Sequence, residues 1–429
     1  MEDQRNFANI ERRLCGGDGQ ALQQFTSDSP WSKQAVCDQI QDDIRAHPAL
    51  QSGGLIILDE SSDEKAGEAS VGAGRQHNGR LGKTEMSQTI VSLAYAHPAS
   101  GTWALIDGEL FLPEVWFTPE YAKRRQTVGL PPERAFATKL ELGLQMIRRV
   151  QAGGLPFEFV ACDDLYGRSR AFRAVLDAEH IQYAAEVPSN TQVYLQCPKV
   201  EVPRRRHRRG NTPTRLKVLS RQVPHEVRRL ARSKQTIWQR VAVRNTERGE
   251  LIADFAVRPV WTLTETLQVR REWLVIRRDD DGKLTSVLLN APEDMSHSIL
   301  IQRSCQRYFT ERTYQDAKSE LGWADFQAQK YRAWEHHTAL TAAATWFVAN
   351  LKLKWREAYV RDPALAHQFE VKVLPALSTA NVRELLQAVL PVPQLTPQQA
   401  RELVATHLVN RTRSLASRLK TQRLYEDSG

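Results

Sequence analysis

The chain of 429 residues is too long for one ordinary hydrophobic core, since domains commonly contain roughly 100–200 residues. With 41% hydrophobic and 25% charged residues, its composition is that of a globular protein and not of a disordered chain. No stretch approaches the roughly 18 apolar residues of a membrane helix, and the charged N-terminus lacks the apolar region of a signal peptide. We therefore expect neither a membrane-spanning nor a secreted protein.

The charge balance and the cysteines further restrict which class of protein this chain can be. Lys and Arg number 59 against 50 Asp and Glu, which gives a net charge of +9. A basic protein of this size most often binds nucleic acid or another polyanion. The five cysteines are scattered without a CxxC pair, which disfavours a zinc ribbon or a disulfide framework and suits a reducing cytoplasm.

The N-terminal part of the chain alternates between helical and strand patterns. Residues 1–50 have helical spacing, and the pair Gly53-Gly54 ends that pattern. The segment 70–82 is rich in glycine and predicts turns. Short apolar runs and helical spacing predict strands at 55–58, 89–96, 103–112, 157–162 and 183–187, with helices at 131–151 and 169–179. This order is typical of an α/β layered core.

The C-terminal half begins with a strongly basic segment. Residues 199–240 contain 14 Lys and Arg against two Glu, and strand-like runs follow up to residue 289. Helical patterns return from Ser296 to Trp355, and residues 364–429 are expected to be helical with proline breaks and a basic tail. The chain thus divides into five regions. They are a helical N-terminal region (1–50), the first part of a core (51–188), a basic β-rich insertion (189–292), the second part of the core (293–360) and a helical basic C-terminal region (361–429).

Two aspartates stand directly after short apolar strands. Asp59 follows residues 55–58, and Asp163 follows residues 159–162. A carboxylate at the end of a core strand is held rigidly and is accessible, as a metal site requires. The alternative for either residue is an ordinary turn aspartate.

Three other acidic residues compete with these two aspartates. Glu60 and Asp164 are their chain neighbours, but adjacent residues at a strand end point in opposite directions, so only one of each pair should face a metal. Asp107 also ends an apolar run and remains an alternative first aspartate.

A further acidic residue, Glu311, lies between two cations. On a helix, Arg307, Glu311 and Lys318 would share one face. The arrangement could be an exposed ion-paired surface, worth well under about 1 kcal/mol. It could also be a metal ligand with phosphate-binding cations on either side.

Three segments, in order along the chain, resemble regions of DDE-type insertion-sequence transposases. A strand ending in aspartate opens the first, an aspartate with a downstream Tyr-Gly opens the second, and a glutamate helix forms the third. The segments are 55–83, 159–188 and 307–344. One subgroup of that family has a β-strand insertion and a signature of Tyr, two residues, Arg, three residues, Glu, six residues, Lys. Arg307, Glu311 and Lys318 match its spacing, whereas Ser304 stands at the Tyr position.

The resemblance implies an RNase H-like (retroviral-integrase-like) catalytic core of the α/β class, interrupted by a β-rich insertion and flanked by helical N- and C-terminal regions. It also implies that Asp59, Asp163 and Glu311 bind two Mg²⁺ ions, for which Mn²⁺ should substitute. Two such ions activate an oxygen nucleophile and stabilise the leaving oxygen of a phosphodiester. We expect the three carboxylates to converge.

The implied function is a Mg²⁺-dependent DNA transposase that cuts and joins DNA at the ends of an insertion sequence. Its partners would be double-stranded DNA, as terminal inverted repeats and target DNA, and a second copy of the chain on that DNA, without a membrane. The expected location is the bacterial cytoplasm at the nucleoid. Alternatives are a transposase-derived DNA-binding protein without nuclease activity and a stand-alone RNase H-like nuclease, and the intact acidic triad favours the transposase over the binding protein.

The basic segment is the main candidate for sequence-independent contact with DNA phosphates, although a solvated loop is its alternative. The expected DNA-binding residues are Arg204, Arg205, Arg206, Arg208, Arg209, Arg307 and Lys318. In the resembling subgroup, an aromatic residue of the insertion can stack on a flipped base. Trp238, Trp261 and Trp273 are the candidates here, with core packing as the alternative.

Overall fold

The structure is a computed structural model. It describes residues 20–78, 82–204, 214–219, 222–246, 249–325, 328–361 and 377–389, with short pieces between 396 and 416. Within these residues, no helix has both the length and the apolar character needed to cross a membrane. The cysteines among them, Cys37, Cys162, Cys197 and Cys305, are free.

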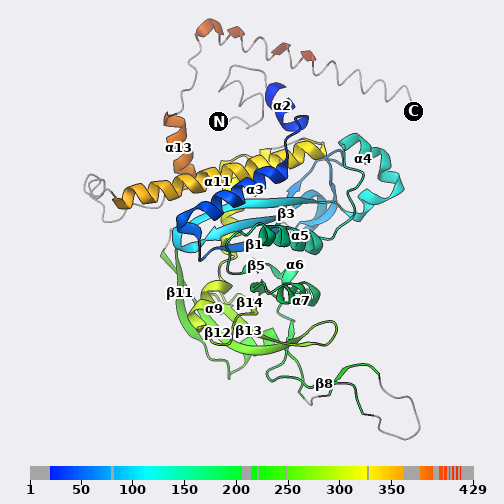
Figure 1. Ribbon diagram of the computed structural model, residues 1–429, viewed down its shortest axis with the longest axis vertical. Coiled ribbons are helices and arrows are strands. Elements are labelled where there is room, and N and C mark those ends of the chain that lie inside the picture. The colour runs from blue at the N-terminus through cyan, green and yellow to red at the C-terminus, as the bar shows by residue number, and fades with distance from the viewer. Residues whose placement is uncertain are drawn as a thin grey trace.

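A large mixed sheet forms the centre of the protein (Figure 1). Among the described residues it contains ten strands, in the order β11-β12-β13-β14-β6-β5-β1-β3-β2, with β4 also paired to β3. The strands are β1 (Leu55–Glu64), β2 (Gly74–Asn78), β3 (Lys83–His97), β4 (Thr102–Phe111), β5 (Val160–Cys162), β6 (Tyr183–Glu186), β11 (Gln239–Thr246), β12 (Gly249–Leu263), β13 (Val269–Arg278) and β14 (Leu284–Leu289). The predicted α/β class is confirmed as a mixed α/β fold.

The strands at the centre of the sheet differ in direction. Strand β1 is antiparallel to β3 but parallel to β5, and β5 is parallel to β6. The strands predicted for the insertion do not form a sheet of their own. They continue the central sheet because β14 pairs with β6, with Leu288 opposite Ala185. Figure 1 shows β11–β14 extending the sheet away from the long helix α11.

Helices cover the sheet and connect its strands. They are α2 (Gln20–Ser27), α3 (Lys33–Ala46), α4 (Ala122–Val128), α5 (Lys139–Ala152), α6 (Asp164–Gly167), α7 (Arg170–Ala178), α8 (Val227–Arg232), α9 (His297–Ser304), α10 (Tyr308–Gln315), α11 (Tyr331–Arg361) and α13 (Thr379–Val389). A π-helical turn, η5 (Asp316–Glu320), follows α10 directly.

Two predicted helices have different bounds in the structure. The helix expected at 131–151 begins only at Lys139, because Thr138 and Glu141 form a capping box that sets its start. The continuous helix expected from Ser296 to Trp355 is divided into α9, α10, η5 and α11. That division separates the segment that carries Glu311 from the long helix that packs across β4.

Side chains of β1 alternate between two hydrophobic clusters, as the two-residue period of a strand requires. Ile56 and Leu58 belong to the larger cluster, which includes residues of α3, α5, α7 and α11. Leu55 and Ile57 belong to the second cluster, which includes residues of α9, β12, β13 and β14. The next odd-numbered residue, Asp59, therefore lies on the side of α9, and Glu60 lies on the side of α5.

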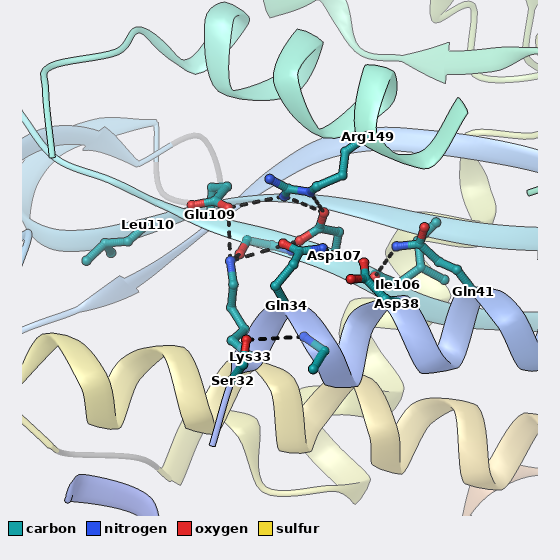
Figure 2. A network of polar contacts seen from close by, with 12 residues as sticks. Ser32, Lys33, Gln34, Asp38, Gln41, Ile106, Asp107, Glu109, Leu110 and Arg149 are labelled. Carbon is teal, nitrogen blue, oxygen red and sulfur yellow. Dashed lines mark hydrogen bonds and ion pairs between the residues drawn. The ribbon is translucent and has the colours of Figure 1, made fainter. Parts of the chain in front are cut away.

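A buried group of charges attaches α3 to the sheet (Figure 2). The Nζ of Lys33 donates to Oε1 of Glu109 at 2.9 Å and to the carbonyl of Gly108 at 2.7 Å. Arg149 of α5 reaches both Glu109 and Asp107. Burial opposes the charge of Lys33, yet Glu109 and Asp107 raise its pKa above the ordinary value.

We predict that Gly167→Ala destabilises the protein. An added Cβ would meet the backbone carbonyl oxygen of Glu186 at 1.8 Å, so α6 or the end of β6 must move. The expected loss of unfolding free energy is about 1–3 kcal/mol or more, measured by denaturant unfolding. Gly67→Ala is the control, because nothing lies within 4 Å of its added Cβ. Equal stability of the two variants would contradict the close approach of α6 to β6.

Candidate active site

The first two candidate aspartates occupy matched positions on neighbouring strands. Leu58 of β1 is paired with Cys162 of β5, so Asp59 and Asp163 both come one residue after that pair. Parallel strands lie roughly 4.8 Å apart, which brings the two residues together although 104 positions separate them in the sequence. Asp163 is also the N-cap of α6, where its carboxylate accepts a hydrogen bond from the N–H of Leu165 at 3.0 Å.

One arginine joins Asp59 to the third candidate carboxylate. Arg307 lies at the N-cap of α10, and its Nη1 donates to Oδ2 of Asp59 at 3.0 Å. Its Nη2 donates to Oε1 of Glu311 at 3.0 Å. Asp59 is only 8% exposed, whereas the side chain of Glu311 is 61% exposed. Asp59 and Glu311 therefore lie on the same side of the sheet, on either side of a single guanidinium.

The same guanidinium also binds Glu186, a residue that the sequence analysis did not select. Its Nε donates to Oε1 of Glu186 at 2.9 Å. Cys162 is paired with Ala185, so Glu186 continues the row formed by Asp59 and Asp163 across three parallel strands. Its local pattern is that of the two aspartates, an acidic residue directly after a short apolar run, but only the pairing of β5 with β6 places it in the row.

Burial and neighbouring acids raise the pKa of both aspartates. Burial is the main cause of the rise in the pKa of Asp59 to about 7, and Asp163 adds to it, while Arg307 opposes it. For Asp163, burial and the charge of Glu60 raise the pKa to about 6, again against Arg307. These carboxyls are therefore costly to ionise without a further positive charge.

Glu60 and Asp164, the chain neighbours of the two aspartates, are hydrogen-bonded to other residues. The carboxylate of Glu60 accepts from Nζ of Lys139 at 2.9 Å and from the hydroxyl of Tyr166 at 3.2 Å. The carboxylate of Asp164 accepts from Nη2 of Arg168 at 2.7 Å, and its side chain is 47% exposed. Asp164 thus lies at the surface of α6, paired with Arg168.

The alternative first aspartate, Asp107, is part of the buried charge group of Figure 2. Its side chain is fully buried, and its Oδ2 accepts from Nε and Nη2 of Arg149 at 3.0 and 2.5 Å. Lys33 lies 4.0 Å away. Asp107 therefore stabilises the contact between β4, α3 and α5, and it is closed to a substrate.

The cation at the other end of the glutamate segment contacts a different residue of β1. Lys318 lies in η5, and its Nζ contacts Oδ1 of Asp63 at 2.9 Å, four residues beyond Asp59 on β1. Asp316 instead accepts hydrogen bonds from Trp103 and Thr379. Lys318 and Asp316 thus face different partners.

Part of the predicted DNA-binding set lies outside the described residues, namely Arg205, Arg206, Arg208 and Arg209. Arg204 is described and exposed. Of the three tryptophans of the insertion, Trp273 is 6% exposed and packs in the second hydrophobic cluster. Trp238 stacks under the guanidinium of Arg278, with 4.2 Å between the ring centroid and Cζ.

The donor set suits a hard divalent cation, because Mg²⁺ prefers carboxylate oxygens. Within the described residues, no group of three acidic, histidine or cysteine side chains is arranged to hold a metal ion. Asp59 and Glu311 are turned to Arg307 instead, which supplies a positive charge between the two carboxylates. The residues fit a cation by their chemistry, provided that Arg307 releases them.

Comparisons with known proteins place the chain among DDE endonucleases and transposases. The family model described as DDE superfamily endonuclease matches residues 1–250. A curated relative, the probable transposase for insertion sequence element IS701 of Microchaete diplosiphon, is 25% identical over 328 residues, which cover 74% of this chain and 71% of the relative.

A solved piggyBac transposase synaptic complex with hairpin DNA is a weaker structural neighbour. It has a TM-score of 0.33 and 13% sequence identity over 81% of this chain. This chain spans 60% of that chain.

We predict that Asp59→Asn stabilises the metal-free protein, and more at pH 8 than at pH 5. The raised pKa means that the folded state resists ionisation, so the destabilisation by Asp59 grows as pH rises from about 4 towards 7 and persists above it. Asparagine removes the charge, and the gain at pH 8 should be on the order of 4 kcal/mol in denaturant unfolding, because each unit of difference in pKa corresponds to about 1.4 kcal/mol.

The control is Asp164→Asn, whose exposed side chain should give little change at either pH. An equal gain for Asp59→Asn at both pH values would show that Asp59 ionises normally in the folded protein.

Proposed function

Because the chain belongs to the DDE superfamily endonuclease family, we propose that it is a DNA transposase of an insertion sequence. In this proposal it cuts and joins phosphodiester bonds at the ends of the element. The observation that carries it is the row of Asp59 and Asp163 on β1 and β5, with Glu311 linked to Asp59 through Arg307. The name of the curated relative, a probable transposase, supports the same function.

The proposed catalytic core is RNase H-like and consists of residues 51–188 and 293–360, with the β-rich insertion at 189–292 between them. The parallel pairing of β1 with β5 supports this division, because it joins the two aspartates before the insertion begins. The helix that carries Glu311 returns to the same side of the sheet after the insertion. Residues 1–50 and 361–429 are proposed as helical regions that contact DNA or a second subunit.

Asp59, Asp163 and Glu311 are the proposed ligands of two Mg²⁺ ions, with Mn²⁺ as a substitute. When bound, such a pair activates the attacking oxygen and stabilises the leaving oxygen of the phosphodiester. The raised pKa values of Asp59 and Asp163 support this role, because a cation repays the cost of ionising them. Arg307 must then release Asp59 and Glu311, and Glu186 keeps it close to the site, where it can bind a DNA phosphate.

The proposed partners are double-stranded DNA and a second copy of the chain. The net charge of +9 supports binding to DNA, and the basic run from Arg204 to Arg209 would neutralise phosphates without reading sequence. Lys318 beside Asp63 is a further candidate for such contact. A homodimer follows from the reaction, since two element ends must be brought together.

We favour an enzyme over a DNA-binding protein derived from a transposase. Two carboxyls with raised pKa values destabilise the folded protein at neutral pH, and binding DNA alone makes no use of them. A stand-alone nuclease would use the same residues, and only the joining of DNA strands separates it from a transposase.

The principal test is Asp163→Asn. The substrate is an end-labelled duplex containing the terminal repeat that flanks the gene, together with adjoining host sequence. The variant should lose cleavage and joining in Mg²⁺, because it lacks one proposed ligand charge, while its binding to the duplex is retained. The matched control is Asp164→Asn, the exposed neighbour bound to Arg168, which should cleave like the unaltered protein.

The possible outcomes of this test distinguish the three functions. Equal cleavage by Asp163→Asn and the unaltered protein at matched DNA occupancy would refute the assignment of Asp163. Binding of genuine element ends without cleavage by the unaltered protein would favour the DNA-binding alternative. Cleavage without joined products would favour the nuclease.

Glu186→Gln should raise the Mg²⁺ concentration needed for half-maximal cleavage. Without the charge of Glu186, Arg307 retains only Asp59 and Glu311 as acidic partners, and it should compete more strongly with the metal for both. We expect a shift of roughly tenfold or more, since one charge-assisted hydrogen bond is worth about 1.5–3 kcal/mol and about 1.4 kcal/mol corresponds to a factor of ten. The measurement is a Mg²⁺ titration of cleavage rate.

Glu158→Gln serves as its control, because Glu158 pairs with Arg303 and does not contact Arg307. A lower maximal rate with an unchanged Mg²⁺ midpoint would mean that Glu186 does not control the position of Arg307.

A further inference from the structure

A polar cavity of about 360 Å³ lies where α6 and α7 meet the start of the insertion. Its volume is within the range of small ligand sites. One wall is basic, and the other is formed by the segment after β6 and by β12. The lining residues that matter here are Arg168, Arg170, Arg173, Asn190, Thr191 and Thr262, which we call the arginine cavity.

The three arginines differ in how far they are neutralised. Arg168 pairs with the exposed Asp164, at 2.7 Å. Arg173 is 3% exposed and pairs with the fully buried Glu272. In the described part of the chain, the exposed Arg170 has neither an ion pair nor a hydrogen bond, and no acidic side chain lines the cavity. The arginine cavity therefore carries an uncompensated positive charge.

The walls of the arginine cavity are fixed by buried contacts. Glu272 accepts hydrogen bonds from the hydroxyls of Thr262 and Tyr183 as well as from Arg173, which ties β12 and β13 to α7. On the other wall, the N–H of Thr191 donates to the carbonyl of Pro188 at 2.9 Å. A site with rigid walls and one free cation needs little rearrangement to receive an anion.

The arginine cavity is close to the candidate active site. Asp163 is the N-cap of α6, and Arg168 is its C-cap. A four-residue helix is about 6 Å long, so one short helix separates the two. Arg170 opens α7, and the positive end of that helix dipole adds to the charge of its guanidinium.

We propose that the arginine cavity binds a phosphodiester group of the DNA strand near the bond that is cut. This inference rests on the proposed function and adds a contact site to it. A phosphodiester carries one negative charge, which matches the single unpaired guanidinium of Arg170. Asn190 and Thr191 present neutral polar groups on the facing wall, and neither side chain has a hydrogen bond in the described residues.

The test measures binding of the full-length protein to the terminal-repeat duplex in EDTA, so that no cleavage intervenes. The ratio of the affinity of the unaltered protein to that of Arg170→Ala should be about eightfold larger at 0.1 M salt than at 1 M salt. The reason is that each phosphate contact contributes a salt slope of about 0.9. The slope of log affinity against log salt should fall by about one. Asn190→Ala should weaken binding less and leave the slope unchanged, since its amide carries no charge.

Arg148→Ala is the matched control. It removes one positive charge, as Arg170→Ala does, but from α5. Arg148 pairs with Glu179, the C-cap of α7, whereas Arg170 is at the N-terminus of that helix. Its affinity and salt slope should equal those of the unaltered protein. Equal losses for Arg148→Ala and Arg170→Ala would indicate a general charge effect and would overturn the site.

Single methylphosphonate substitutions in the duplex locate the phosphate. One position should weaken binding of the unaltered protein, but not of Arg170→Ala, because the neutral phosphate and the missing arginine remove the same contact. Independent losses at every position would overturn the inference.

The outcomes also separate this inference from the proposed function. Cleavage by the unaltered protein, with unchanged affinity and slope for Arg170→Ala, would refute the arginine cavity alone. Arg170-dependent binding without any cleavage would support the phosphate contact and refute the transposase.

Discussion

The guanidinium of Arg307 is the interaction on which the arrangement of the candidate site depends. It is held between Asp59, Glu186 and Glu311, from two strands and one helix. Burial opposes its charge, but these acids raise its pKa above the ordinary value, so it stays charged. Without it, the carboxylates on β1, β6 and α10 would repel one another. Arg307 therefore stabilises the acidic cluster formed by Asp59, Glu186 and Glu311.

The continuous sheet gives this cluster its second constraint. Because β14 pairs with β6, the β-rich insertion is hydrogen-bonded to the strand that ends in Glu186. Glu272 of β13 adds a buried contact to Arg173 of α7. Breaking one partner of a buried pair costs about 3–5 kcal/mol, so the insertion and the core are strongly coupled.

Buried charge has two different roles in this protein. Around Asp107, Lys33 and Arg149 neutralise the carboxylates of Glu109 and Asp107. This group of charges fixes α3 and α5 to β4. Around Asp59 the balance is incomplete, and burial raises the pKa of the carboxyl to about 7. Incomplete neutralisation is characteristic of sites that bind a further ion or substrate, whereas a satisfied group stabilises the fold.

The sequence by itself determined the α/β class and most of the strands, and it singled out Asp59 and Asp163 as candidates, because an acidic residue after a short apolar run is a local pattern. It also indicated the pairing of Arg307 with Glu311, which depends only on helical spacing. Only the tertiary structure decided that Asp107 is closed inside a charge group, that Glu186 belongs to the acidic row, and that the insertion shares the central sheet. These features depend on strand register and on contacts between residues far apart in the chain, which no local pattern encodes.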